Sequence, residues 1–173
     1  EVPTIAVSHF IFPQVAQKMR ARRKAGIRDI YVKSVSLMLA LTIPIVVPLY
    51  VFADFFVTTI FGDDYIDAAP ILQVTIFYSL IVPFNRQFGT IMDGLKKPKL
   101  NFYTLVAIAV LNVIFCYFFL KWFGIIGCAY GTLLAFVLVF IVNQFILHKH
   151  FKINTFSVIT HIFYWYAVGF KML

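Results

Sequence analysis

Charged residues are scarce in this chain of 173 residues: they make up 13% of it, whereas hydrophobic residues make up 62%. Together with a mean hydropathy of +0.91, this composition lies far outside that of soluble domains and excludes a water-soluble monomer. Acids are scarcest, with seven Asp and Glu against fifteen Lys and Arg. Because the cations stand in short clusters between apolar runs, their excess indicates a membrane surface, and we expect no nucleic-acid partner.

The sequence also lacks the motifs of common catalytic and cofactor sites. It contains no glycine loop of the Walker type, no nucleophile elbow, no HExxH and no Rossmann fingerprint. We therefore expect neither an enzyme nor a bound cofactor. His148 and His150 form an HxH pair without a third ligand nearby in the sequence, so no metal site is predicted. Cys116 and Cys128 lie inside apolar runs, and we interpret them as small apolar residues, not as a disulfide or a zinc pair.

Long apolar runs dominate the rest of the sequence and predict an all-α fold, a polytopic bundle of transmembrane helices. Each run is longer than a membrane strand needs and none alternates with period two, which argues against a membrane barrel. A bundle of four transmembrane helices is expected over residues 34–147, with spans at about 34–61, 70–92, 100–120 and 123–147. Pro44 and Pro48 predict a kink in the first span.

The two ends of the chain carry further predictions. Residues 1–16 end in an apolar stretch too short to cross a bilayer, so we interpret them as the end of a truncated transmembrane helix in a fragment of a longer transporter. Residues 17–33 hold seven Lys and Arg and are expected to form a basic cytoplasmic loop. Residues 148–173 are expected to hold a cytoplasmic segment and then a helix that is either interfacial or a truncated terminal span, because its aromatic residues suit the headgroup zone.

The distribution of cations predicts the topology. Twelve of the fifteen Lys and Arg fall in alternate loops, at residues 17–33, 93–99 and 148–154. Positive residues close to span ends are retained on the cytoplasmic side, so these three loops should be cytoplasmic. The acidic turn at 63–67 and the short turn at 121–124 should then face outward.

The second span contains the strongest candidate site residues, the consecutive polar residues Asn85, Arg86 and Gln87. An ionised guanidinium in hydrocarbon is costly unless it meets water, protein or an anion. Arg86 is therefore either an anion-binding group on a central cavity, with Asn85 and Gln87 as further substrate contacts, or a snorkelling or structural arginine. Weaker polar signals, more typical of interhelical hydrogen bonds than of substrate contacts, are Asn112, Asn143 and Gln144.

Two further sets of residues have predicted roles. Asp54, toward the outer end of the first span, could titrate in ion coupling or simply meet interfacial water. Gly127 and Gly131 form a GxxxG pattern, and with Gly124 they predict a smooth face for close helix packing.

An ordered set of short motifs resembles a known family over about residues 10–150. The motifs are Phe12-Pro13, Tyr31-x-Lys33-Ser34, Phe61-Gly62-x-x-Tyr65-x-x-Ala68-Ala69-Pro70-Ile71-Leu72-Gln73, Gly94-x-x-Lys97 and Phe123-Gly124-Ile125-x-Gly127-x-Ala129. The long central motif is the most specific of them. This order of motifs resembles the polysaccharide transporter branch of the multidrug/oligosaccharidyl-lipid/polysaccharide exporter superfamily. That branch comprises the O-antigen and capsule repeat-unit flippases.

The resemblance implies a transport function. Such proteins are two-lobed helix bundles that move polyprenyl-diphosphate-linked oligosaccharides from the inner to the outer leaflet of the bacterial plasma membrane for surface polysaccharide biosynthesis. This chain would match the C-terminal lobe of a multi-pass protein. Its partners would be membrane lipid, the lipid-linked glycan, and the missing N-terminal lobe or a second copy of the chain.

Three alternatives stay open from the sequence. A cation-coupled multidrug exporter of the same fold would favour carboxylates inside the membrane, whereas the deepest charge here is Arg86. A membrane-embedded glycan polymerase or ligase would need a large catalytic outer loop, whereas the outward turns expected here are short. A partner-binding fragment without an activity of its own is the third alternative.

Overall fold

The computed structural model describes residues 24–151 and 158–162. Within these ranges the chain is helical apart from short turns and contains no strand, which confirms the all-α fold. The predictions for residues 1–16, for 17–23 and for most of the C-terminal segment lie outside the described residues. The elements are α2 (Lys24–Val51), α3 (Ala53–Phe61), η1 (Asp63–Ala68), α4 (Ala69–Ser79), α5 (Val82–Gly94), α6 (Pro98–Phe123) and α7 (Ile125–Phe151).

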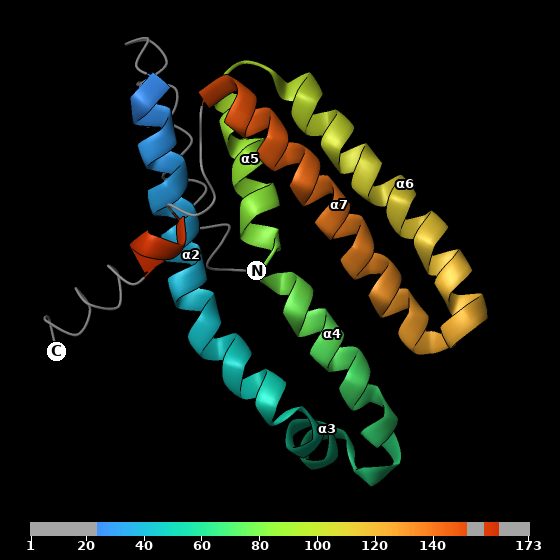
Figure 1. Ribbon diagram of the computed structural model, residues 1–173. Coiled ribbons are helices and arrows are strands. Elements are labelled where there is room, and N and C mark those ends of the chain that lie inside the picture. The colour runs from blue at the N-terminus through green and yellow to red at the C-terminus, as the bar shows by residue number, and fades with distance from the viewer. Residues whose placement is uncertain (1–23, 152–157, 163–173) are drawn as a thin grey trace, which may run out of the picture.

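Four segments of the described chain are long and apolar enough to cross a membrane. They are Gly26–Val51, Asp63–Gly94, Pro98–Phe123 and Ile125–Phe151. Figure 1 shows them side by side, with α2 next to the α4–α5 segment and α7 between that segment and α6. The bundle of membrane-spanning helices predicted from hydropathy is therefore present.

The first span differs from its predicted bounds at both ends. Helix α2 begins at Lys24, so residues 24–33, expected as loop, are helical. The reason is an apolar stripe among the cations: Ile27, Ile30 and Tyr31 recur at helical spacing and are all buried. At the other end α2 stops at Val51, and residues 53–61 form the separate helix α3. Two prolines lie inside α2, which changes direction along its length in Figure 1.

The second span is two helices, α4 and α5, joined at Leu80 and Ile81. Each helix has a proline in its first turn, Pro70 in α4 and Pro83 in α5. Proline suits that position because the first turn of a helix has no intrahelical partner for its N–H groups. The break at Leu80 therefore coincides with the point where Pro83 starts a new helix.

Helices α6 and α7 form the antiparallel hairpin predicted for the last two spans, and their backbones approach closely at two glycines. A Cβ at Gly131 would lie 2.8 Å from the backbone of Phe115 and Cys116, and one at Gly127 would overlap the carbonyl of Phe119. Gly124 does not share this role, because nothing lies within 4 Å of its Cβ position. It ends α6 with a φ of +66°, a conformation that favours glycine, so its predicted part in helix packing is wrong.

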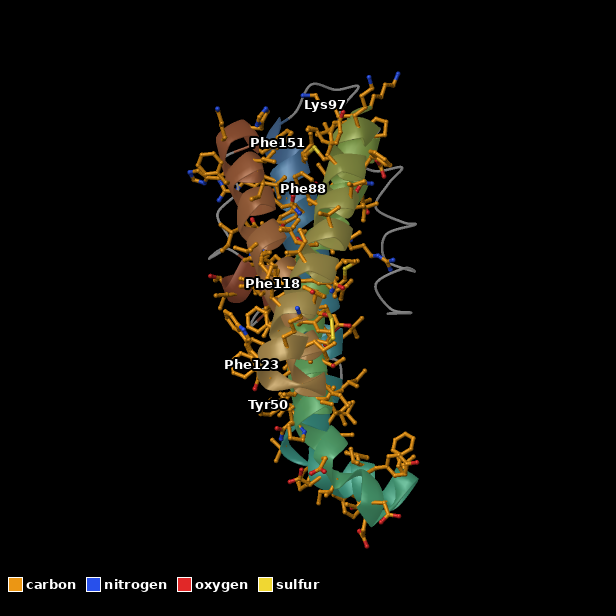
Figure 2. All side chains as sticks on the ribbon, turned by 90° about the vertical axis from the view of Figure 1, so that its right-hand side faces the viewer. Tyr50, Phe88, Lys97, Phe118, Phe123 and Phe151 are labelled. Atoms are coloured by element: carbon orange, nitrogen blue, oxygen red, sulfur yellow. A yellow bond between two sulfur atoms is a disulfide. The ribbon has the colours of Figure 1, made fainter. Side chains whose placement is uncertain are left out.

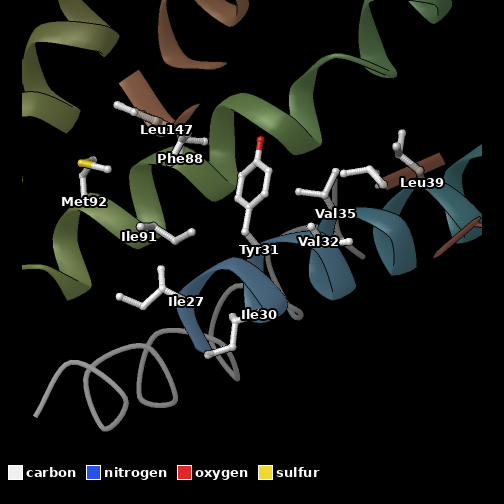
Figure 3. Close-up of a cluster of buried hydrophobic side chains, with 11 residues drawn as sticks. Ile27, Ile30, Tyr31, Val32, Val35, Leu39, Phe88, Ile91, Met92 and Leu147 are labelled. Atoms are coloured by element: carbon white, nitrogen blue, oxygen red, sulfur yellow. The ribbon is translucent and has the colours of Figure 1, made fainter. Parts of the chain in front are cut away.

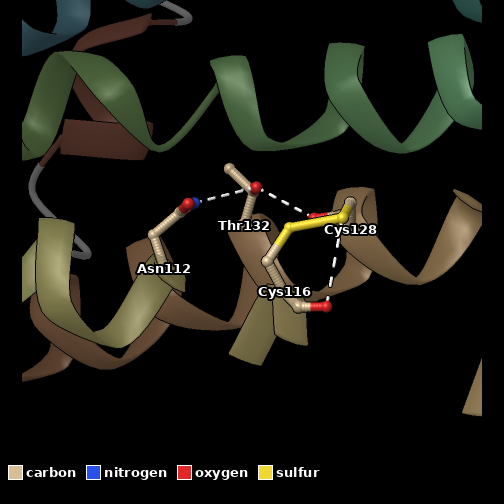
Figure 4. The surroundings of a disulfide bond; sticks show 4 residues. All are labelled: Asn112, Cys116, Cys128 and Thr132. Carbon is tan, nitrogen blue, oxygen red and sulfur yellow. Dashed lines mark hydrogen bonds between the residues drawn. A yellow bond between two sulfur atoms is a disulfide. The ribbon is translucent and has the colours of Figure 1, made fainter. Parts of the chain in front are cut away.

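The close approach of α6 and α7 also pairs the two cysteines. Cys116 and Cys128 form a disulfide with their Cα atoms 4.3 Å apart, as Figure 4 shows. Their interpretation as two unpaired apolar residues is therefore wrong. An apolar position reveals nothing about a partner on another helix, and the small residues beside Cys128 bring the two backbones within the reach of a disulfide.

The largest hydrophobic cluster joins the first half of α2 to α5 and to the end of α7. Figure 3 shows this cluster, in which Tyr31, Phe88 and Leu147 have no exposed surface. In contrast, no residue of α6 is buried, and Val113 is 69% exposed. Because a membrane-spanning helix meets lipid instead of water, this exposed apolar surface is the expected lipid-facing side of the bundle.

Most charged residues of the described chain lie near the two ends of the bundle: most cations at one end, with Asp29 and Asp93 among them, and most acids at the other. We call one end the basic end; it holds the start of α2, the turn between α5 and α6, and the end of α7, as the positions of Lys97 and Phe151 in Figure 2 show. Its exposed cations are Arg28, Lys33, Lys96, Lys97, Lys99 and Lys149. The acidic residues of η1 lie beyond the other end, below Tyr50 in Figure 2.

Candidate functional site

Helix α5 carries the consecutive polar residues Asn85, Arg86 and Gln87 in the interior of a span. Successive residues of an α-helix point about 100° apart, so the three side chains leave the helix in different directions. Their surroundings in the bundle therefore differ, although they are adjacent in sequence.

Asn85 points toward α7 and is 9% exposed. Its Nδ2 donates a hydrogen bond of 3.3 Å to the carbonyl of Phe136, and its Oδ1 accepts one of 3.1 Å from Nδ2 of Asn143. The Oδ1 of Asn143 in turn accepts a hydrogen bond of 3.4 Å from the hydroxyl of Thr104 on α6. These contacts tie α5, α6 and α7 together in the membrane interior, where unpaired polar groups are costly.

Gln87 points toward α2 and has no exposed surface. Its Nε2 donates a hydrogen bond of 3.4 Å to the sulfur of Met38. Both amides that flank Arg86 thus bind neighbouring helices, a role that accounts for them without a substrate.

Arg86 is partly buried. In contrast to the amides of Asn85 and Gln87, its guanidinium is not bound by a neighbouring helix: among the described residues, no hydrogen-bond partner reaches its buried Nη1. The acid nearest along α5 is Asp93, two turns or about 10 Å of helical rise away. The carboxylate of Asp93 accepts a hydrogen bond of 2.8 Å from Asn101. In the described part of the chain, Arg86 therefore lies inside a span without a hydrogen bond to an acidic side chain.

A second interhelical contact lies in the apolar cluster near the basic end, and the sequence did not reveal that Tyr31 takes part in it. Nε2 of Gln144 donates a hydrogen bond of 2.6 Å to the hydroxyl of Tyr31, which joins α7 to α2. Figure 3 shows this hydroxyl pointing away from α2 toward the neighbouring helices. A tyrosine among apolar residues on the inner face of a helix is the signal that could have indicated such a partner.

Three amides with weaker signals are interhelical hydrogen-bond partners, as predicted. Asn143 binds Asn85, and Gln144 binds Tyr31. Asn112 on α6 donates a hydrogen bond of 2.9 Å to the hydroxyl of Thr132 on α7, one turn from the disulfide (Figure 4).

Asp54 and the HxH pair lie near the ends of the spans. Asp54 is exposed in the first turn of α3, beyond the end of the first span at Val51, where the positive end of the helix dipole favours a carboxylate. Its position suits an acid that meets interfacial water, the second of the two roles expected for it. His148 and His150 lie in the last turn of α7. No group of three potential metal ligands occurs in the described ranges.

The family model described as MatE matches residues 6–118, which is more than half of the chain. The chain belongs to the MatE family. The matched segment includes α5 and most of α6, and therefore the whole polar triplet around Arg86. Membership in this family agrees with the multi-pass arrangement of the spans and favours a transporter over an enzyme.

Two curated archaeal proteins are similar to this chain. The probable low-salt glycan biosynthesis flippase Agl15 of Haloferax volcanii is 29% identical over 84% of the chain and 30% of its own length. The membrane protein MJ1068 of Methanocaldococcus jannaschii is 31% identical over 61% of the chain and 22% of its own length. The chain therefore spans less than a third of the length of these relatives. No solved structure is significantly similar to it.

Proposed function

We propose that this chain is part of a flippase that moves polyprenyl-diphosphate-linked oligosaccharides across the cell membrane for surface glycan biosynthesis. The observation that carries the proposal is Arg86, a cation inside a span whose neighbouring amides already bind other helices. Membership in the MatE family and the similarity to a glycan biosynthesis flippase support the same function.

The chemistry of the substrate explains why such an arginine is useful. A diphosphate that crosses the membrane loses much of its hydration, and this cost must be offset by cations along its path. Guanidinium groups bind phosphate oxygens through two parallel hydrogen bonds, which are stronger than hydrogen bonds between neutral groups. We assign Arg86 to this contact, while Asn85 and Gln87 hold α5 in place for it.

The basic end supplies a second element of the proposed function. Cations from α2, the α5–α6 turn and α7 lie at one end of the bundle, and each lysine or arginine near an anionic membrane surface contributes about 1 kcal/mol of attraction. We place this end in the cytoplasm by the positive-inside rule. There it would attract the diphosphate headgroup of the substrate.

The chain would contribute the C-terminal lobe of the transporter. It covers less than a third of its curated relatives, so a complete cavity requires either a further lobe or a second copy. Both relatives are archaeal, so they do not support the assignment to bacteria, and we extend the proposed localisation to the cell membrane of a prokaryote.

Substitution of Arg86 in the source organism tests this function. We expect Arg86→Gln to lower surface glycan about tenfold or more, because one charge-assisted hydrogen bond of about 1.5–3 kcal/mol is lost. Arg86→Lys should retain part of the export, since it keeps the charge but loses the bidentate geometry. Surface glycan and membrane-bound lipid-linked oligosaccharide would both be quantified at equal protein levels, and the lipid-linked form should accumulate.

The matched control is Lys121→Gln, which removes an exposed cation at the end of α6, where Lys121 lies over the ring of Tyr117. It should leave export unchanged. Normal export by Arg86→Gln would remove Arg86 from the site. Unchanged surface glycan after deletion of the whole gene would disprove the flippase function itself.

A further inference from the structure

Helix α3 exposes large apolar side chains on several of its sides. Phe55 is 62% exposed, and Ile60 and Phe61 are each 66% exposed. Only Ala53 and Val57 are buried, in a small cluster with the start of α4. A nine-residue helix with so much exposed apolar surface calls for an apolar partner.

The direction of α3 limits what this partner can be. The first span, Gly26–Val51, has 26 residues. From Lys33, the last exposed cation of this span at the basic end, to Val51 the helix rises about 27 Å at 1.5 Å per residue, close to the hydrocarbon core of about 30 Å, so Val51 lies near the opposite membrane boundary. The chain then turns: Figure 1 shows α3 nearly end-on, and Figure 2 shows it leaving the lower end of the bundle sideways. Helix α3 therefore runs along the boundary instead of continuing the span.

The segment that follows marks the water side of this boundary. Gly62, with a φ of +96°, connects α3 to η1, where Asp63, Asp64 and Asp67 are all exposed. Three carboxylates cannot enter hydrocarbon at an acceptable cost. The ring of Tyr65, with its centroid 6.3 Å from that of Phe61, joins the two segments, and tyrosine is enriched at the membrane interface.

We propose that α3 and η1 form an interfacial hairpin that lies on the membrane at the end of the bundle opposite the basic end. The partner is the lipid bilayer itself, because the exposed side of α3 continues the apolar surface that α2 exposes to lipid, up to Val51 and Phe52. Phe55, Ile60 and Phe61 insert among the upper acyl chains, and the carboxylates of η1 face water. The hairpin fixes the depth of α2 and α4 in the membrane, whatever the protein transports.

Fluorescence quenching in lipid vesicles tests this depth. Single tryptophans are introduced by Phe55→Trp and Phe61→Trp in the full-length protein of the organism, after all of its native tryptophans, Trp122 and Trp165 among them, are replaced by Phe. Val113→Trp, on the exposed face of α6, serves as the deep control, and Asp64→Trp serves as the aqueous control. Vesicles contain lipids brominated either near the headgroup or near the end of the acyl chain, and iodide is the aqueous quencher.

We expect Phe55→Trp and Phe61→Trp to be quenched mainly by bromine near the headgroup, and several-fold less by iodide than Asp64→Trp. Val113→Trp should be quenched mainly by bromine near the chain end. The inference is overturned if both α3 tryptophans respond to iodide as Asp64→Trp does, or to deep bromine as Val113→Trp does. Protection from every quencher would also overturn it, because another protein surface would then cover α3.

Discussion

Asn143 shows at the scale of single residues how polar side chains organise this bundle. Its amide donates to Asn85 on α5 and accepts from Thr104 on α6, so that one residue of α7 holds two neighbouring helices. Backbone and side-chain polar groups find no water inside a bilayer, and such pairs therefore specify which helix faces fit together.

Asn143→Leu should destabilise the bundle by about 1–2 kcal/mol, because it removes both hydrogen bonds and leaves Oδ1 of Asn85 unpaired in the membrane interior, whereas Thr104 keeps its hydrogen bond to the carbonyl of Leu100. Thermal unfolding of the purified protein in detergent would measure this change. Val142→Leu is the matched control, since Val142 is the exposed neighbour on the same helix. Equal stability of Asn143→Leu and the parent protein would show that the contact contributes nothing.

Arg86 contrasts with the amides on either side of it. Asn85 and Gln87 have partners on α7 and α2, whereas the buried Nη1 of Arg86 has no hydrogen-bond partner among the described residues. The sequence singled out Arg86 by its charge but left Asn85 and Gln87 as further candidate substrate contacts, because hydropathy and charge are the same whichever way a side chain points. Only the packing of α5 separated two structural amides from one candidate site residue.

At the scale of elements, the α6–α7 hairpin depends on residues without large side chains. Gly131 lies against the backbone of Phe115 and Cys116, so any Cβ there forces the helices apart. The same close approach allows the disulfide between Cys116 and Cys128.

Gly131→Val should lower the stability of the hairpin by about 1–3 kcal/mol, the usual cost of overpacking. It should also separate the two cysteines, so that they react with a thiol-specific maleimide after mild detergent solubilisation. Leu138→Val, farther along α7 on its more exposed side, should change neither property. An unchanged disulfide together with unchanged stability would contradict the role of Gly131 in helix packing.

The disulfide itself can be tested by mass spectrometry of the protein purified without reductant. We expect the peptides that contain Cys116 and Cys128 to be linked, and to separate after reduction. Cys116→Ser should free Cys128 for alkylation and lower the free energy of unfolding by at most a few kcal/mol, as a short closed loop predicts. Two free thiols in the unreduced parent protein would show that the pair is not bonded in the cell membrane.

At the scale of the whole molecule, charge separates along the axis of the bundle. The basic end and the acidic η1 lie at opposite ends of the spans, in agreement with the predicted distribution of loops. Because positive residues close to span ends are usually retained in the cytoplasm, we expect the basic end to be cytoplasmic and η1 to face outward.

Labelling of intact cells tests this orientation. In a background with Cys116 and Cys128 replaced by Ser, we expect Asp64→Cys to react with a membrane-impermeant maleimide added outside. Lys97→Cys, at the basic end, should react only after the cells are permeabilised. The reverse pattern would show that the bundle has the opposite orientation, with the basic end outside the cell.

The sequence by itself determined that this protein lies in a lipid membrane, that it is helical and that it has four spans. It also indicated the interhelical role of Asn112, Asn143 and Gln144. These properties follow from local sums of hydropathy and from the rule that polar groups in lipid must be paired, so they need no knowledge of which helices meet.

Tertiary structure decided the rest. It paired Tyr31 with Gln144, 113 residues away, and Asn85 with Asn143, 58 residues away. It also joined the cysteines and turned α3 away from the direction of α2. Each of these outcomes depends on which helix faces pack together and on how far a span extends through the bilayer, and neither quantity is contained in a local stretch of sequence.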